Sequence, residues 1–576
     1  MLGIRLIDWA VVVTYLLGIT VIGLWAVRKV RSSTSFFIGD RKFGKVMMAF
    51  FMFGSGTNSD QAVSVAAKTY RVGASGIWYQ WLWLFVTPFF WLIAPFFRRM
   101  RAVTTGDYFE VRYGRSVSGL YAAMGILQLL VAVGVMLKGS GAVIEAVSGG
   151  AISARLAIVS MTVIFLIYGV AGGLSAAIAT NFIQGLLTVV LSFLILPFAL
   201  MHPDVGGMSG LRESISDANM LSLAPPGEIT IFFIAVIAFN ALVGWVTMPE
   251  TMANCAAGKT EMEGRMGVTV GIFGKRICTV AWMLTGLCAV VIYSNGRLED
   301  VDLVYGQMAR DLLPKIGPGL IGLFLASMLA SVMSTCDSLM VVASALFTEN
   351  IYKKFLVSAR ADRHYTLIGR IASVAIVFFG ILFAFSLESV VEGLEIFWMV
   401  SAMMGIAFWV GLFWRRATVA GAWAATMTSF AALLFTSKIA FGKYVLWDFN
   451  VQLAQNLPAF MLWDDKLYLP WQMIIYLSIG FVVLVVVSLL TRRVSADGLD
   501  RLYGCLRTPI GADEPETEAF TLPPGVQAGP RDVIIDHPDF EIPRPTVVGI
   551  FGFAVAWVGV ALLVAAVYLI IGRPNW

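Results

Sequence analysis

The stretch MMAFFMFGSGTNSDQAVSVAA, residues 47–67, decides the fold. Its ends are apolar enough for a membrane helix, but Gly54 to Asp60 brings glycines, hydroxyls and a carboxylate together in the middle. Non-helical backbone is tolerated at membrane depth where it is buried in protein or lines a cavity. A second stretch, IAVIAFNALVGWVTMPETMA at 234–253, is interrupted by Gly244 and a following proline. We therefore predict two broken membrane helices.

The composition agrees with a membrane protein. The chain has 576 residues, of which 59% are hydrophobic and 13% charged. Soluble domains are roughly half apolar and about a quarter charged. Apolar segments of about 20 residues, each long enough to cross ~30 Å of hydrocarbon as a helix, recur about 14 times. Such long apolar runs exclude a β-barrel, whose strands are short and alternate in polarity.

The predicted spans are 6–28, 45–70, 76–98, 116–146, 152–170, 174–201, 228–250, 266–293, 317–350, 366–387, 390–413, 418–440, 471–491 and 546–572.

Basic residues gather in alternate loops when the N-terminus is placed outside. Since positive residues flanking membrane helices stay in the cytoplasm, this pattern predicts a multi-pass inner-membrane protein with both termini outside. The basic residues of the predicted cytoplasmic loops are Arg28, Lys29, Arg31, Arg41, Lys42, Lys45, Arg98, Arg99, Arg101, Arg112, Arg115, Lys353, Lys354, Arg360, Arg363, Arg415, Arg416, Arg492 and Arg493.

The spans divide the chain into five parts. We predict a leading helix and cytoplasmic loop at 1–44, a ten-helix core at 45–413, two further helices at 414–494, a cytoplasmic linker at 495–545 and a last helix at 546–576. The linker is rich in proline and acidic residues, a composition typical of a flexible tether.

The two broken spans predict a binding site. Five spans separate their starts, which suits two five-helix repeats. Paired interruptions in corresponding places point to a site at the membrane midplane, with freed carbonyls for a cation and helix ends for a substrate. Around the second break the candidates include Trp245, Thr247 and Glu250. The alternative is that glycines let the helices pack closely and the polar groups bond to neighbours.

At these residues the chain resembles the sodium:solute symporter family, and within it the bacterial sodium/galactose type. The motifs are SFFIGDRKFG at 35–44, TTGDYFEVRYG at 104–114, GGLSAAIATNFIQG at 172–185, SVMSTCDSLMVVASALFTENIYKKF at 331–355 and GLFWRR at 411–416. The resemblance implies an inverted five-plus-five repeat core like that of the bacterial leucine transporter. It also implies sodium-coupled symport of a small polar solute, with sodium as the coupling ion, no cofactor and no obligate protein partner.

The resemblance also implies the sodium ligands. They are the carbonyls near Gly54 and Thr57 in the first broken helix, the carbonyl of Ser331, and the hydroxyls of Ser334 and Thr335. A hard cation prefers an all-oxygen shell of this kind. Without the resemblance, the small residues of the later helix are equally suited to close packing.

Substrate contacts are carried over in the same way. Gln61 matches a sugar-contacting glutamine, Gln80 stands in place of a sugar-binding glutamate, and Lys275 matches a sugar-contacting lysine. Asp60, Trp245 and Glu250 are further candidates. Trp83 replaces a serine of the family pattern and Leu394 replaces a glutamine, so galactose itself is not predicted. A sugar, polyol or small organic acid is expected between aromatic walls.

A second cation site is a further hypothesis. Relatives with two sites have an aspartate where this chain has Asn181, and here Asp337 lies one turn beyond Ser334 and beside Ser338. A carboxylate inside a membrane helix needs a partner, which a second sodium or a proton would supply. The alternative is that Asp337 pairs with a basic side chain such as Lys275 or bonds to hydroxyls.

Other protein classes fit the sequence less well. A transporter-like sensor needs a signalling domain, whereas this sequence ends in a span, and a channel does not need a closed midplane site. A membrane enzyme needs a nucleophile, an acid/base pair or a metal cluster; the three histidines lie outside the predicted spans, and metal-ligand spacing is absent. Coupling to protons through carboxylates remains the alternative to sodium, and no nucleic-acid partner is implied.

Overall fold

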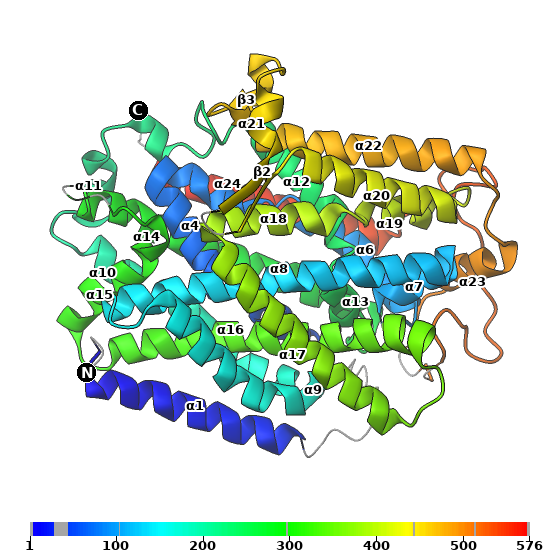
Figure 1. Ribbon diagram of the computed structural model, residues 1–576, viewed down its shortest axis with the longest axis horizontal. Helices are drawn as coiled ribbons and strands as arrows, with labels where there is room; N and C mark the ends of the chain where they lie inside the picture. Colours follow the sequence, from blue (N-terminus) through cyan, green and yellow to red (C-terminus); the bar gives the residue numbers. More distant parts are fainter. Residues whose placement is uncertain are drawn as a thin grey trace.

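The computed structural model describes residues 4–27, 44–102, 104–294, 296, 298–441, 444–511, 514, 515 and 517–572. Long helices run side by side along the molecule and form one bundle, which α17 crosses obliquely (Figure 1). Within the described residues, eight helices are long and apolar enough to cross a membrane, or nine when one bent pair is counted as a span. The prediction of a polytopic helical membrane protein is therefore confirmed.

The first half of the chain contains α1 Leu6–Val27, α3 Lys45–Gly56, α4 Ser59–Val72, η2 Gly73–Ile77, α5 Trp78–Trp81, α6 Thr87–Arg99, α7 Thr105–Tyr113, α8 Arg115–Ser148, α9 Ala154–Phe193, α10 Leu196–Leu200, α11 Gly207–Ser214, η3 Ala218–Leu221, α12 Ile231–Trp245, α13 Pro249–Ala256 and α14 Glu261–Ile292.

The second half contains η4 Val301–Leu303, α15 Val304–Ile316, α16 Leu320–Ala345, its π-helical continuation η5 Leu346–Leu356, α17 Asp362–Ser386, α18 Val390–Ala402, α19 Gly405–Phe413, α20 Val419–Phe435, α21 Phe449–Ala454, η6 Ala459–Met461, α22 Leu469–Leu490, α23 Ala496–Arg507 and α24 Val547–Ile571.

Two small antiparallel hairpins form a projection between α20 and α22. Strand β1 (Lys438–Phe441) pairs with β2 (Tyr444–Asp448), and β3 (Leu462–Trp463) pairs with β4 (Lys466–Leu467). The projection stands out from the helical bundle beside the start of α22 (Figure 1).

Both predicted breaks are present. Between α3 and α4, Thr57 and Asn58 adopt extended backbone, with φ and ψ of −122° and 110° for Thr57. Between α12 and α13 the chain bends by 63°, and the second helix starts at Pro249. Proline lacks the N–H that a continuous helix needs, so the restart at Pro249 follows directly from the sequence.

The third predicted span is not one helix. The segment 76–98 consists of α5, a turn at 82–86 and α6, which begins at Thr87. Pro88 is in the first turn of α6. Since proline has no N–H to donate to the carbonyl four residues earlier, Pro88 favours a new helix start over a continuous span.

The boundary between the predicted spans 152–170 and 174–201 also differs. Helical residues run without interruption through α9, from Ala154 to Phe193. The predicted boundary coincides with two glycines at 172–173, but a glycine inside a helix is destabilising by only about 1 kcal/mol. A straight helix of this length would measure roughly 60 Å, more than one crossing, so the total of about 14 spans stays a prediction.

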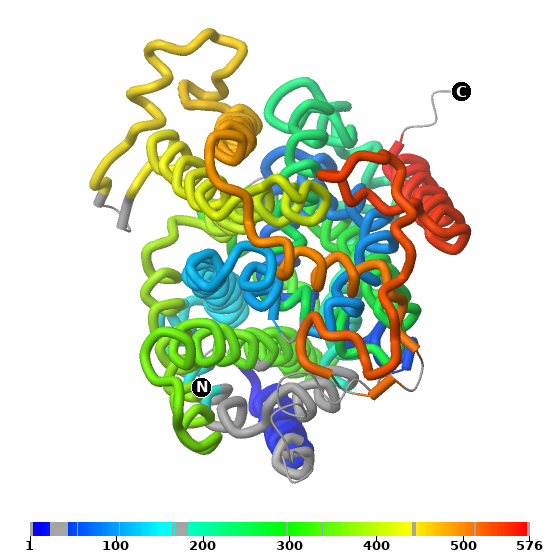
Figure 2. The backbone as a smooth tube through the Cα atoms, turned by 90° about the vertical axis from the view of Figure 1, so that its right-hand side faces the viewer, coloured from blue at the N-terminus to red at the C-terminus, as the bar shows by residue number. Residues whose placement is uncertain are grey.

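The prediction of a flexible tether at 495–545 is wrong for the described residues. The segment begins with α23 and lies across the ends of the bundle helices (Figure 2). Glu514 forms an ion pair with the buried Arg101 at 2.6 Å, and Phe520 is 1% exposed. Glu514 and Glu541 pair with Arg101 and Arg415, which lie outside the segment, and composition alone does not reveal these pairings.

Candidate functional site

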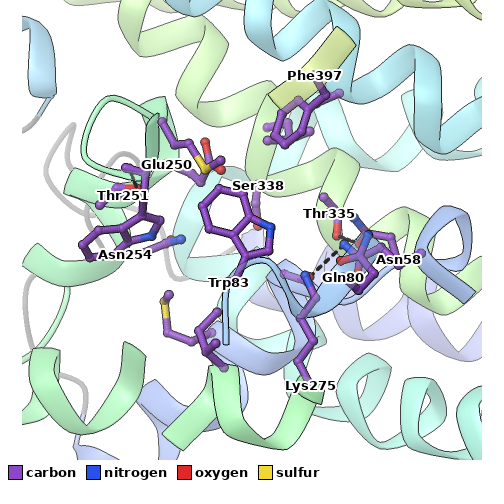
Figure 3. Close-up of a pocket in the computed structure, with 18 of the residues that line it drawn as sticks. Asn58, Gln80, Trp83, Glu250, Thr251, Asn254, Lys275, Thr335, Ser338 and Phe397 are labelled. Carbon is purple, nitrogen blue, oxygen red and sulfur yellow. Dashed lines mark hydrogen bonds between the residues drawn. The ribbon is translucent and has the colours of Figure 1, made fainter. Parts of the chain in front are cut away.

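The two breaks border one cavity of about 150 Å³. All six predicted substrate residues line it: Asp60, Gln61, Gln80, Trp245, Glu250 and Lys275. Thr335 and Ser338 of α16 line it as well. Residues that are far apart in the chain therefore converge on one space, around which Figure 3 draws and labels members of the lining.

The first break frees carbonyl oxygens at the end of α3. The last carbonyls of a helix lack partners within it, and here side chains from other elements supply them. The hydroxyl of Ser334 donates to the carbonyl of Gly54 at 3.2 Å. The carbonyl of Gly56 accepts from Gln61 Nε2 at 3.1 Å and from the Lys275 ammonium. The break is therefore held by α4, α14 and α16 together.

Close packing of α14 on α3 places Lys275. A Cβ on Gly271 would lie 2.8 Å from Cβ of Met52 and 2.9 Å from the carbonyl oxygen of Ala49. Only glycine allows the two helices to approach this closely. One turn further along α14, Lys275 reaches the end of α3.

The structure brings several predicted sodium ligands together. Ser334 contacts the Gly54 carbonyl, while Thr335 donates to the side-chain oxygen of Asn58 in the break. Thr57 is buried, and its hydroxyl has no hydrogen-bond partner among the described residues. The Ser331 hydroxyl bonds to Met328 O within α16, at 2.8 Å, and the role predicted for the Ser331 carbonyl stays a prediction. The resulting set of oxygens suits a hard cation.

The second cation site stays a prediction. The side chains of Asn181 and Asp337 lie outside the described part of the structure. The Ser338 hydroxyl donates to the carbonyl of Ser334 at 3.2 Å and lines the cavity.

Two positions at which the chain departs from the family pattern lie at the cavity. Trp83 and Leu394 both line it, so a polar position has become an indole and another has become an aliphatic side chain. Phe90, Phe397 and Trp398 complete an apolar wall. In the view of Figure 3, the Trp83 ring lies between Glu250 and the group around Lys275.

Sequence reasoning missed Arg276. This residue is 1% exposed, lines the cavity, and donates through its guanidinium to the carbonyl of Gln80. Its carbonyl accepts from Trp81 Nε1 at 3.2 Å. A second basic residue next to Lys275 inside an apolar span was the available signal, since ionisable groups at membrane depth are functional candidates.

A polar network beside the cavity was also missed. Tyr79 donates to Glu395 at 2.6 Å, and Lys68 pairs with Glu228 at 2.6 Å. The Lys68 ammonium lies 4.7 Å from the centre of the Tyr79 ring, which is 5.1 Å from the ring of the cavity-lining Trp398. These contacts tie α4, α5 and α18 to the segment before α12.

Within the described residues, no group of three or more histidine, cysteine, aspartate or glutamate side chains could hold a metal ion. All five cysteines are buried, and none of them forms a disulfide.

Comparison with known proteins gives concordant results. The model of the sodium:solute symporter family matches residues 36–429. The chain is 23% identical to the sodium/glucose cotransporter of Vibrio parahaemolyticus, over 75% of this chain and 85% of the relative. It is 22% identical to the high-affinity proline transporter PutP of Bacillus subtilis, over 74% of this chain and 91% of the relative.

A solved structure of a Na⁺-coupled sialic acid symporter in a substrate-bound outward-open state shares the fold. The TM-score is 0.70 with 18% identity, and the match covers 85% of this chain and 99% of that chain. The expected inverted-repeat transporter fold is thereby confirmed. The relatives are transporters, which also confirms that the chain is not an enzyme.

Proposed function

Because the chain belongs to the sodium:solute symporter family, we propose that it uses a sodium gradient to carry a small polar solute through the cavity between its two broken helices. One observation carries the proposal: the Gly54 carbonyl and the Ser334 hydroxyl meet at 3.2 Å, next to a cavity lined by Asp60, Gln61 and Lys275. An oxygen-rich cation site beside a solute cavity is the arrangement that coupling needs.

Sodium binding and solute binding are coupled because both sites use the break between α3 and α4. Sodium at the end of α3 would interact with carbonyls of the break, while Lys275 and Gln61 connect the same break to the cavity through the carbonyl of Gly56. A cation that orders the break therefore orders the solute site. By linkage, the solute must raise the affinity for sodium by the same factor.

Alternating access requires that the cavity be closed on one side at a time. We assign one closure to the network beside the cavity, where Tyr79 bonds to Glu395 and Lys68 pairs with Glu228. These bonds join α5 to α18 and α4 to the segment before α12, so opening this side breaks them. The ion pair is partly buried, with Glu228 at 27% exposure, so water can reach it when it opens.

The experiment is uptake into proteoliposomes. Purified protein is reconstituted, and labelled solutes are supplied with an inward gradient of sodium or of choline. Sodium-dependent accumulation is expected. Equal uptake in sodium and in choline, combined with dependence on a pH gradient, would replace sodium by protons as the coupling ion.

We also propose a plasma-membrane location with both termini outside and the 495–545 segment in the cytoplasm. Single cysteines at Asp204 and at Asp536, both exposed, test this topology, since the five native cysteines are buried. A membrane-impermeant maleimide should label Asp204→Cys in intact cells and Asp536→Cys only after permeabilisation. The reverse pattern would invert the topology.

A further inference from the structure

The two restarted helices carry equivalent carboxylates. Asp60 is the second residue of α4, and Glu250 is the second residue of α13. Both line the cavity. The first turn of a helix is the positive end of its dipole, where transporters with broken helices often hold an anionic group of their substrate. Here the protein's own carboxylates occupy both positions, which disfavours a solute carboxylate there.

The two basic side chains at the cavity are directed at backbone carbonyls. Lys275 donates to Gly56 and Arg276 donates to Gln80. With Asp60 and Glu250, these side chains make two positive and two negative groups at the cavity. A solute without net charge leaves this balance unchanged.

Several hydrogen-bonding atoms of the residues that line the cavity have no partner. Asp60 Oδ1 and Gln61 Oε1 are buried and have no partner within the described residues, and the two residues are only 5% and 8% exposed. Arg276 Nε is buried without a partner as well. The residues that line the cavity thus contain two acceptors that need donors, and one donor that needs an acceptor. A buried polar atom without a partner is costly, so a ligand that satisfies all three gains affinity.

The walls suit a positive group. Trp83, Trp245 and Phe90 line the cavity, and the ring centroids of Trp245 and Phe90 are 3.8 Å apart. Aromatic faces attract an ammonium group, and a carboxylate near it strengthens binding further.

We propose that the transported solute is a small amine zwitterion, resting on the proposed function of the cavity as a symport site. Its protonated amine donates N–H bonds to Asp60 Oδ1 and Gln61 Oε1, with Glu250 adding negative charge. Its anionic group accepts from Arg276 Nε. A neutral sugar has no positive group for the aromatic walls and the carboxylates to attract, and a simple organic acid would add one uncompensated negative charge to a balanced cavity.

The test compares solutes that differ in one group. Binding to the detergent-purified protein in sodium is followed by tryptophan fluorescence, since Trp83, Trp245 and Trp398 line the cavity. The probes are L-alanine, L-serine and L-proline, with propionate, L-lactate, ethylamine, N-trimethylated alanine, galactose and myo-inositol as comparisons. We expect at least one of the three zwitterions to bind tenfold or more tightly than every comparison compound. Stronger binding by galactose, myo-inositol or a carboxylate would overturn the proposal, as would equal binding by the trimethylated amine, which has no N–H to donate.

A variant adds a second test. Asp60→Asn should weaken binding of the preferred zwitterion at least tenfold, while Asp204→Asn, at an exposed residue, should leave it unchanged. Wild-type affinity in Asp60→Asn would overturn the assignment. If the variant does not fold, the comparison of solutes on the wild-type protein still decides.

Uptake measurements separate this inference from the proposed function. Sodium-driven uptake of a sugar and not of an amine keeps the symport proposal and overturns the zwitterion. Uptake of a zwitterion that is equal in sodium and in choline supports the zwitterion and overturns sodium coupling.

Discussion

Removing the hydroxyls of Ser334 and Thr335 tests the sodium site. Ser334 lies 3.2 Å from the Gly54 carbonyl, and Thr335 contacts Asn58 in the same break. Alanine at either position removes one oxygen from the proposed shell and leaves the helix intact, since alanine has the highest helix propensity.

The expected loss of sodium affinity follows from the removal of one oxygen ligand. A buried polar contact whose partner is removed is worth roughly 1 to 3 kcal/mol. At 1.4 kcal/mol per factor of ten, each substitution should raise the sodium concentration for half-maximal transport by about fivefold to 150-fold. The double variant should exceed either single variant, although neighbouring sites need not be additive.

The assay is solute uptake as a function of sodium concentration in proteoliposomes, with protein insertion measured in parallel. Ser327→Ala is the matched control, because Ser327 is a buried serine of the same helix whose hydroxyl bonds to Leu323 O at 2.8 Å, away from the break. Ser327→Ala should keep the wild-type sodium dependence. An unchanged sodium dependence in a well-inserted Ser334→Ala/Thr335→Ala variant would show that this face of α16 serves packing.

Three further outcomes are expected. Lys275→Met keeps the aliphatic stem and removes the ammonium group that donates to the Gly56 carbonyl. The affinity for solute should therefore fall roughly tenfold or more, while the affinity for sodium changes less. Normal solute affinity in this variant would contradict the prediction. Asp337→Asn should lower the sodium Hill coefficient from near two toward one, and a wild-type coefficient of one would exclude the second site. Burial raises the pKa of Asp302, outside the membrane spans, from its ordinary 3.8 to about 6, so the folded state binds this proton more tightly than the unfolded state. Stability should therefore rise by about 2 kcal/mol as pH falls from 6 to 4, and Asp302→Asn, compared with wild type by thermal unfolding at both pH values, should remove that increment.

Local chemistry made part of the site predictable. Glycine and proline act on the backbone of their own segment, so the breaks at Gly54–Asp60 and at Pro249 could be located without any long-range information. The resemblance then supplied Gln80 and Lys275, and all six predicted substrate residues line one cavity.

The missed residues share one property, which is that their partners are far away in the chain. Arg276 meets Gln80 across 196 positions, and Tyr79 meets Glu395 across 316. The 495–545 segment resembles a solvated linker by composition, and its burial depends on arginines such as Arg101, which precedes Glu514 by 413 positions. Pattern and composition carry no information about such pairings.

The membrane class, the two interrupted helices and the residue types at the interruptions can be read from the amino-acid sequence, because each follows from apolar length or from the backbone limits of glycine and proline. Only the tertiary structure decided which atoms are satisfied. Lys275 could have faced solute, water or backbone, and the packing of α14 on α3 directs it to the Gly56 carbonyl. The same packing leaves Asp60 Oδ1 and Gln61 Oε1 without partners in the part of the chain that the structure describes. Hydrogen-bond satisfaction depends on distances of a few tenths of an ångström between distant segments, and those distances exist only once the helices have packed.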